Sequence, residues 1–278
     1  MSIKSATLNG VATVEIARPE KKNAITMAMY QQMADAINAA AADPAVRAVL
    51  LTGQPGIFTS GNDIEDFMQR PPSTTESPAF VFMKALMGCE KPVIAAVTGA
   101  AIGIGTTMLL HCDFVYVSDE ARLAMPFVSL GLVPEFGSSL VVPQLMGNAR
   151  AAEKLLLGDP FTGADAVEAG IANAVLPAAE VMPHARRIRA LLSRTAPGGS
   201  ALKRSAMRRA WLTTSVAGST ALAMPSSTAV SPLNGSPSSS SSVAFACPTR
   251  WGTSRLDAYS GTSPRPTKGI ARRASSLT

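Results

Sequence analysis

The feature that most constrains the fold is an apolar run without charged side chains at residues 93–110. Its length approaches that of a membrane-spanning helix. It is interrupted by glycines at 99, 103 and 105 and contains three threonines, and Lys91 and Pro92 stand directly before it. This pattern favours a buried strand that runs into a glycine-rich turn and a core helix, so we expect no membrane association.

Strand and helix patterns alternate through residues 1–197. Alternating or continuous apolar residues predict strands at residues 12–16, 45–52, 92–98 and 114–118. Helices are predicted at residues 27–42, with Thr26 as N-cap, and at 106–111, 149–157 and 164–169. This order predicts an α/β layer architecture.

Charge divides the chain into two regions. Residues 1–197 hold 15 Lys+Arg and 18 Asp+Glu, whereas residues 198–278 hold 10 Lys+Arg and one acid, Asp257. The net charge of +6 therefore comes from the tail. It gives no reason to expect that the predicted domain of residues 1–197 binds nucleic acid. A nucleic-acid role for the basic tail is the weaker option. Three cysteines without metal-ligand spacing predict neither a disulfide framework nor a metal site.

The amino-acid composition of the tail, residues 198–278, changes from about residue 210. Ser, Thr, Pro, Gly and Ala dominate, and apolar periodicity ends. Such a composition buries too little surface to offset the entropy of ordering, which predicts disorder. The alternative is a shift of reading frame after about Arg209, and the coding DNA would decide between the two. The N-terminus lacks an export or organelle signal, so we expect a cytoplasmic protein.

Two glycine-bearing turns predict a ligand site. Residues 56–64 follow the strand that ends at Thr52, and residues 99–105 join a buried strand to the helix at 106–111. Backbone N–H groups at such turns are free to face a ligand, and a helix N-terminus adds a positive dipole end. Two such turns side by side could stabilise one developing oxyanion.

Four motifs resemble the enoyl-CoA hydratase/isomerase (crotonase) superfamily in order and spacing. They are GIFTSGNDIEDF from residue 56, KPVIAAVTGAAIGIG from 91, CDFVYVSDEARLAMPFVSLGLVPEFGSS from 112 and GDPFTGADAVEAGIANAVLP from 158. The resemblance covers about residues 5–197. It implies a ClpP-like spiral of ββα units, in which C-terminal helices complete the acyl pocket and assist trimer formation. In this chain that helical region is expected to be lost or aberrant.

The resemblance also implies roles for individual residues. The oxyanion-hole donors would be the backbone N–H groups of Asn62 and Ile104, with Gly103 and Gly105 shaping the second turn. The adenine end of coenzyme A would lie along Ser60, Gly61, Asp63 and Ile64. Its pantetheine and phosphates would lie near Arg18, Lys21 and Lys22, although both lysines could be solvated surface charges.

The departures from the family pattern indicate which reaction is expected. Hydratases of this family use two glutamates to activate water, and their positions hold Thr107 and Phe127 here. The remaining acid is Glu135, at the position where the Δ3,Δ2-enoyl-CoA isomerase branch, above all its peroxisomal type, carries its catalytic glutamate. One carboxylate can move a proton between two carbons without water, a metal or a redox cofactor. The predicted activity is therefore isomerisation of 3-enoyl-CoA, with coenzyme A present only as part of the substrate.

An apolar lining of Ile104, Phe127, Leu130 and Phe136 is expected to raise the pKa of the Glu135 carboxyl group.

Several alternatives accompany the predicted isomerase activity. Without the resemblance, Glu135 would be interpreted as a cap of a helix near Ser138 or as a partner of an arginine. His111 and Cys112 are expected at buried helix positions, not as a nucleophile pair. Other crotonase reactions, a non-catalytic CoA-ester binder and a defective gene product stay open, as does assembly into a homotrimer or hexamer.

Overall fold

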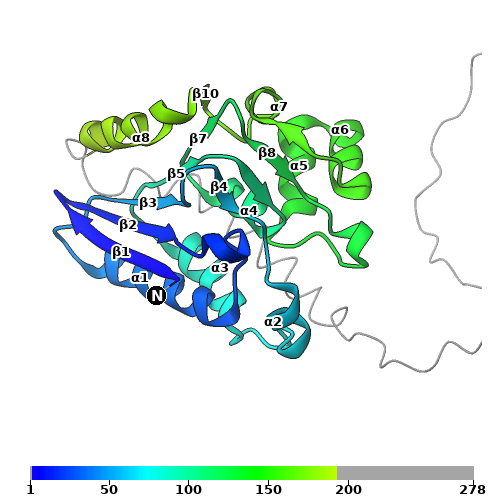
Figure 1. Ribbon diagram of the computed structural model, residues 1–278, viewed down its shortest axis with the longest axis horizontal. Helices are drawn as coiled ribbons and strands as arrows, with labels where there is room; N and C mark the ends of the chain where they lie inside the picture. Colours follow the sequence, from blue (N-terminus) through cyan, green and yellow to red (C-terminus); the bar gives the residue numbers. More distant parts are fainter. Residues whose placement is uncertain (1, 193–278) are drawn as a thin grey trace, which may run out of the picture. The chain divides into compact units, whose positions relative to one another are not determined.

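Two sheets organise residues 2–192, which are the residues that this computed structural model describes (Figure 1). The large sheet has the strand order β1-β2-β3-β5-β7-β10, and the small sheet has the order β4-β6-β8-β9. All neighbours are parallel except the pairs β1–β2 and β8–β9. The predictions for the tail of residues 198–278, including the frame shift, lie outside the described residues.

The chain alternates between the two sheets in a repeating order. A strand of the large sheet, a strand of the small sheet and a helical segment follow one another three times, which is the expected spiral of ββα units. The first unit is β3 (Ala48–Thr52), β4 (Ile57–Thr59), α2 (Ile64–Gln69) and α3 (Pro78–Gly88); the second is β5 (Val93–Val97), β6 (Ala100–Ile102), α4 (Ile104–Thr107) and η2 (Met108–His111); the third is β7 (Phe114–Ser118), β8 (Arg122–Ala124), η3 (Val128–Leu130) and α5 (Ser138–Met146).

The remaining elements flank these units. The chain begins with β1 (Ile3–Leu8), β2 (Val11–Ile16), η1 (Pro19–Lys21) and α1 (Met27–Ala42). After α5 come α6 (Asn148–Ala152), η4 (Glu153–Leu157), β9 (Phe161–Thr162), α7 (Gly163–Glu168), β10 (Ala174–Leu176) and α8 (Ala178–Leu192).

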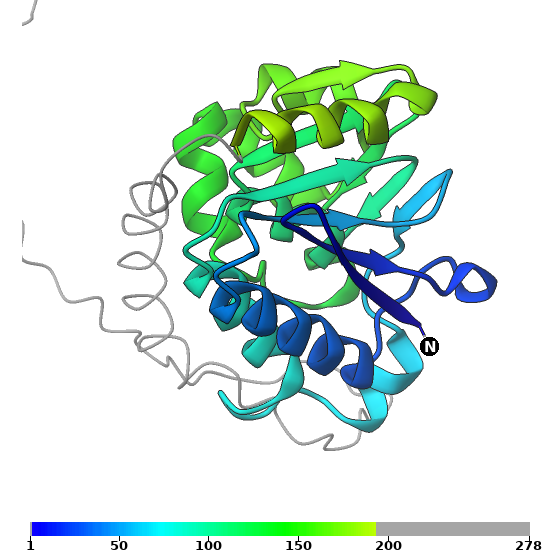
Figure 2. The ribbon, with the colours of Figure 1, turned by 90° about the vertical axis from the view of Figure 1, so that its left-hand side faces the viewer.

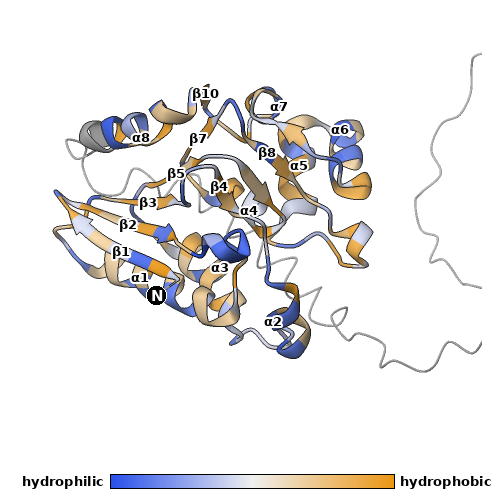
Figure 3. Ribbon diagram, in the orientation of Figure 1, coloured by the Kyte–Doolittle hydropathy of each residue, from blue (hydrophilic) through white to orange (hydrophobic). Residues whose placement is uncertain are grey.

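The central strands of the large sheet are buried on both faces. In β3, Val49 and Leu51 pack with α1 and α3, whereas the alternate residue Leu50 packs with α8. Because side chains alternate between the faces of a strand, a strand covered on both sides reads as a continuous apolar run. Figure 2 shows α1 and α8 on opposite sides of this sheet, and Figure 3 shows its central strands coloured as hydrophobic.

Most of the predicted elements are confirmed. Helix α1 spans the predicted residues, and the Thr26 side chain accepts a hydrogen bond from the Met29 amide. The apolar run at 93–110 forms β5, β6, α4 and η2 in place of one long helix. Among residues 2–192 no helix combines the length and apolar character needed to cross a membrane.

Two predicted boundaries are wrong. The strand expected from residue 45 begins at Ala48, because Asp43 ties the preceding residues into a turn by accepting a hydrogen bond from the Ala45 amide. The helix expected at 106–111 begins earlier, at Ile104, directly after Gly103 with φ of 57°, and tightens into a 3₁₀ helix from Met108.

Candidate active site

The two glycine turns predicted from the sequence lie against each other. Each predicted segment contains a strand of the small sheet, because residues 56–64 include β4 and residues 99–105 include β6. The two strands are parallel neighbours, and Gly61, Gly103 and Gly105 follow their carboxyl ends. A Cβ atom at Gly61 would lie 3.0 Å from the Ile102 carbonyl oxygen, and one at Gly105 would lie 2.5 Å from Cγ2 of Thr59. Glycine is therefore required for the backbones to come this close.

The Asn62 and Ile104 amides are available to a ligand. The Ile25 amide donates to the Gly61 carbonyl and the Asp63 amide donates to the Ile25 carbonyl, a parallel bridge that directs the Asn62 amide to the opposite side. Ile104 is the first residue of α4, and the first amides of a helix have no carbonyl group within the helix to donate to. Among residues 2–192 neither amide donates to a protein acceptor. Both can donate to one oxygen if they converge on it.

A buried asparagine that the sequence analysis missed builds the first turn. Asn23 is fully buried, with φ of 56°, and its side-chain amide donates to the Ile57 and Phe58 carbonyls at 3.1 Å each. Thr59 Oγ1 donates to the Asn23 carbonyl at 2.7 Å and accepts from the Gly61 amide at 3.1 Å. The only sequence signal was an asparagine beside two lysines, which resembles an ordinary surface turn.

Arg18 supports this turn from outside. Its guanidinium donates to Asp63 Oδ2 at 2.6 Å and to the Ala24 carbonyl at 3.0 Å. The hydrogen bond from Arg18, followed by that from the Asp66 amide, lowers the pKa of the Asp63 carboxyl group. Asp63 caps α2, so Arg18 also has a structural role here, whereas Lys21 and Lys22 are exposed.

Glu135 enters the site from a tight turn before α5. The Ser138 amide donates to the Glu135 carbonyl at 3.0 Å, and the two residues between them have positive φ, 53° at Phe136 and 69° at Gly137. The Glu135 carboxylate accepts a hydrogen bond from Thr107 Oγ1 at 3.3 Å. Thr107 lies three residues after Ile104 in α4, about 4.5 Å along the helix axis. The carboxylate is thus brought next to the helix whose first amide is an oxyanion-hole candidate.

The environment of Glu135 suits a base at neutral pH. Burial raises the pKa of its carboxyl group to about 7, and the hydrogen bond from Thr107 opposes part of this rise. No second acid among residues 2–192 contributes to the shift. The pKa of Tyr30 is also raised, first by burial and then by the nearby Glu135 charge. Tyr30 donates a hydrogen bond to the Asn62 side chain, so this phenol, which the sequence analysis missed, lies beside both parts of the site.

The four residues predicted to form an apolar lining differ in burial. Ile104, Phe127 and Phe136 are buried, whereas Leu130 is 57% exposed. Of the residues predicted near adenine, Gly61 is buried, Ser60 and Asp63 are half-buried and Ile64 is exposed.

Two structural alternatives for the sequence motifs can be assessed. Glu135 does not cap α5, whose N-cap is Gly137 without a side-chain hydrogen bond. It also forms no ion pair with an arginine of residues 2–188. His111 and Cys112 are buried, as predicted, but the predicted helix positions are only partly confirmed, because His111 is the last residue of η2 and Cys112 follows it in extended conformation.

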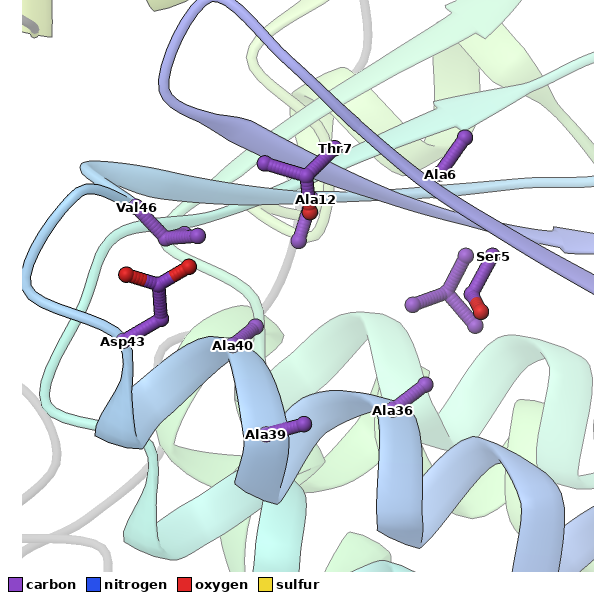
Figure 4. A pocket seen from close by; sticks show the side chains of 10 residues that line it. Ser5, Ala6, Thr7, Ala12, Ala36, Ala39, Ala40, Asp43 and Val46 are labelled. Carbon is purple, nitrogen blue, oxygen red and sulfur yellow. The ribbon is translucent and has the colours of Figure 1, made fainter.

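A separate cavity of about 170 Å³ lies between the β1–β2 hairpin and α1 (Figure 4). Small side chains such as Ala36, Ala39 and Ala40 line it, together with Asp43. No residue of the predicted site takes part in this cavity. It lies apart from the two glycine turns.

Comparisons with known proteins agree with this arrangement. The enoyl-CoA hydratase/isomerase family matches residues 6–231. Human enoyl-CoA delta isomerase 2 is 38% identical over 176 residues, which make up 61% of this chain and 44% of the human protein. The chain therefore spans less than half the length of this relative.

Solved structures of the same family are also similar to this chain. OdaA of Pseudomonas aeruginosa is 50% identical, with a TM-score of 0.70 over 78% of this chain and 87% of that one. An enoyl-CoA hydratase/isomerase of Pseudoalteromonas atlantica is 34% identical, with a TM-score of 0.73 over 81% of this chain and 92% of that one. The matched residues, the ββα spiral and the paired glycine turns together show that this chain belongs to the enoyl-CoA hydratase/isomerase family of the crotonase superfamily and is similar to its delta-isomerase branch.

Proposed function

We propose that this protein is an enoyl-CoA delta isomerase, which converts 3-enoyl-CoA into 2-enoyl-CoA. The observation that carries the proposal is the Glu135 carboxylate, with a pKa of about 7 beside α4 and no second acid near it in the described part of the chain. Thr107 and Phe127 stand where the hydratases of the family carry their glutamates. One carboxylate can both accept and return a proton, so it suffices for proton transfer between two carbons.

The reaction would begin with substrate binding at the two turns. The thioester oxygen would accept hydrogen bonds from the Asn62 and Ile104 amides. Glu135 would remove a proton from C2, and the electron pair would delocalise into a dienolate with negative charge on that oxygen. Each donor of such a hole contributes about 3 kcal/mol to transition-state stabilisation. Glu135 would then return the proton to C4, which leaves the double bond between C2 and C3.

The pKa of Glu135 suits both halves of this cycle. A carboxyl group with a pKa of about 7 is partly ionised at neutral pH and can accept a proton. Once it has accepted the proton from C2, the neutral carboxyl group can donate that proton to C4. The catalytic pKa therefore lies near the operating pH, where acid–base catalysis is most effective.

The coenzyme A moiety would extend away from the reacting carbons. We infer that its adenine lies along Ser60, Gly61, Asp63 and Ile64, because this segment follows directly from the oxyanion turn. The exposed cations Lys21 and Lys22 are available to the phosphates. Arg18 would contact the phosphates through guanidinium nitrogens other than Nη1, which donates to Asp63 and Ala24. The reaction needs no cofactor beyond the coenzyme A of the substrate.

Hydration of 2-enoyl-CoA is the second candidate function. The 2,3-dehydroadipyl-CoA hydratase of Escherichia coli, 28% identical over 200 residues, favours it. In this chain Glu135 would have to activate the water without a second glutamate. We therefore expect hydration to be the slower reaction.

A side-by-side assay tests the proposal. The full chain is incubated with 3-enoyl-CoA, 2-enoyl-CoA and dienoyl-CoA esters of equal chain length, and kcat/KM is measured for each. The isomerase proposal predicts the highest value for the 3-enoyl ester. A higher value for hydration or dienoyl isomerisation would refute it, and tight binding without turnover would indicate a CoA-ester binder.

Assembly and location complete the proposal. We infer a cytoplasmic protein that assembles into a homotrimer or hexamer. The assembly is inferred from the resemblance, which implies C-terminal helices that complete the acyl pocket and assist trimer formation. Light scattering of the purified full chain would give the mass of the assembly, and a monomer would contradict this inference.

A further inference from the structure

The backbone next to Glu135 is held in an unfavourable conformation. Phe136 has φ of 53°, in the left-handed region, where a bulky L-residue is rare because its Cβ crowds the backbone. Gly137 continues the turn with φ of 69° at no such cost. A strained residue persists only where its surroundings hold it, and such residues concentrate at functional sites.

His111 holds Phe136 in two ways. Its ring stacks on the Phe136 ring, with centroids 3.8 Å apart and planes inclined by 21°. Its Nε2–H donates to the Phe136 carbonyl at 2.8 Å, so this nitrogen carries the proton. His111 is 4% exposed and Phe136 is 3% exposed, so water does not compete for either contact.

The contacts of His111 and Thr107 fall on consecutive residues of the Glu135 turn. Thr107 in α4 donates to the Glu135 carboxylate, and His111, four residues later at the end of η2, holds Phe136. The same short segment begins with Ile104, the second oxyanion-hole candidate. One helical segment therefore connects the oxyanion side of the site to the base.

We propose that His111 is a positioning residue, which keeps the Glu135 carboxyl group directed into the site by stabilising the left-handed conformation of Phe136. This inference rests on the proposed role of Glu135 as the base. Loss of the stacking and the hydrogen bond from His111 allows Phe136 to relax to negative φ. The peptide between Phe136 and Glu135 then turns, and the carboxyl group moves toward water.

Two variants separate the two contacts. His111→Phe retains an aromatic ring for stacking and loses the hydrogen bond, whereas His111→Leu loses both. We expect kcat for the 3-enoyl ester to fall about 10-fold or more in His111→Leu and less in His111→Phe, with KM nearly unchanged. If His111→Leu does not fold, His111→Phe still tests the hydrogen bond. Ile94→Val, a core change on the α8 face of the large sheet, is the control for a general loss of stability and should keep kcat.

The pH profile supplies a readout that a merely structural role would not move. When the Glu135 carboxyl group becomes solvated, its pKa falls from about 7 toward its ordinary value of 4.5. The acidic limb of kcat should therefore move to lower pH in His111→Leu and stay in place in Ile94→Val. Tyr30 on α1 also faces Glu135, but its pKa is raised well above 10, so it stays protonated across this range.

A double variant completes the test. In a Glu135→Gln background, His111→Leu should cause no further loss, since a residue that acts through Glu135 has nothing left to position. If Glu135→Gln abolishes turnover while His111→Leu keeps the wild-type kcat and acidic limb, the positioning role is wrong and the base assignment stands. If Glu135→Gln keeps full turnover, the proposed function itself fails.

Discussion

Glu135 has the environment that the proposed exchange of protons with carbon at neutral pH requires. Burial raises the pKa of its carboxyl group to about 7, and the Thr107 hydroxyl restrains the rise. The sequence identified Glu135 and predicted the direction of its pKa shift from the apolar residues around it. It did not predict the contacts with Thr107 and Tyr30, because these residues lie 28 and 105 positions away along the chain and meet Glu135 only in the folded structure.

Replacement of Thr107 should move the pH profile of the reaction. Thr107→Val removes the hydrogen bond that stabilises the ionised carboxylate, so the pKa of Glu135 should rise above about 7. Because the base acts in its ionised form, the acidic limb of kcat should move to higher pH. Thr107→Ser keeps the hydroxyl group and should leave the limb in place. A Thr107→Val limb at the wild-type pH would show that this hydrogen bond does not tune the base.

At the scale of elements, the site depends on β4 and β6 ending side by side. The longer strands and helices were predictable because apolar residues recur with the period of each element over five or more residues. Strands β4, β6 and β8 have three residues each, too few for any period to be recognised. The glycine turns were visible in the sequence, but their contact depends on these short strands, which only the family resemblance implied and no periodicity located.

The contact between the turns can be tested with one substitution that introduces a steric clash and a second substitution that removes it. Gly105→Ala would place a methyl group 2.5 Å from Thr59 Cγ2 and push the turns apart. We expect kcat to fall about 10- to 100-fold, because small displacements of catalytic groups are costly. Adding Thr59→Ser removes Cγ2, keeps the hydroxyl hydrogen bonds to Asn23 and Gly61, and should restore most of the activity. A double variant as slow as Gly105→Ala alone would contradict the proposed contact.

At the scale of the whole molecule, the site has an energetic cost. The folded protein holds Glu135 at a pKa of about 7, against an ordinary value of 4.5. Above pH 7 the folded state therefore contains a desolvated carboxylate that the unfolded chain keeps in water. Below pH 4.5 the group is neutral in both states and the penalty vanishes. Natural active sites commonly sacrifice stability in this way.

Glu135→Gln should consequently stabilise the protein in a pH-dependent way. The gain in free energy of unfolding should be at most about 3 kcal/mol above pH 7, decline as the pH falls, and disappear below about 4.5. Denaturant unfolding of the full chain at several pH values measures it. A gain of equal size at all pH values would indicate a packing effect in place of a desolvated charge.

The central claim is that one carboxylate carries the proton from C2 to C4 while two backbone amides hold the thioester oxygen. Turnover of a 3-enoyl-CoA ester by Glu135→Gln tests it most directly, with binding of the same ester measured in parallel. The account predicts that kcat falls about 10²- to 10⁴-fold while the ester still binds with nearly wild-type affinity. A variant that turns over at the wild-type rate would contradict it.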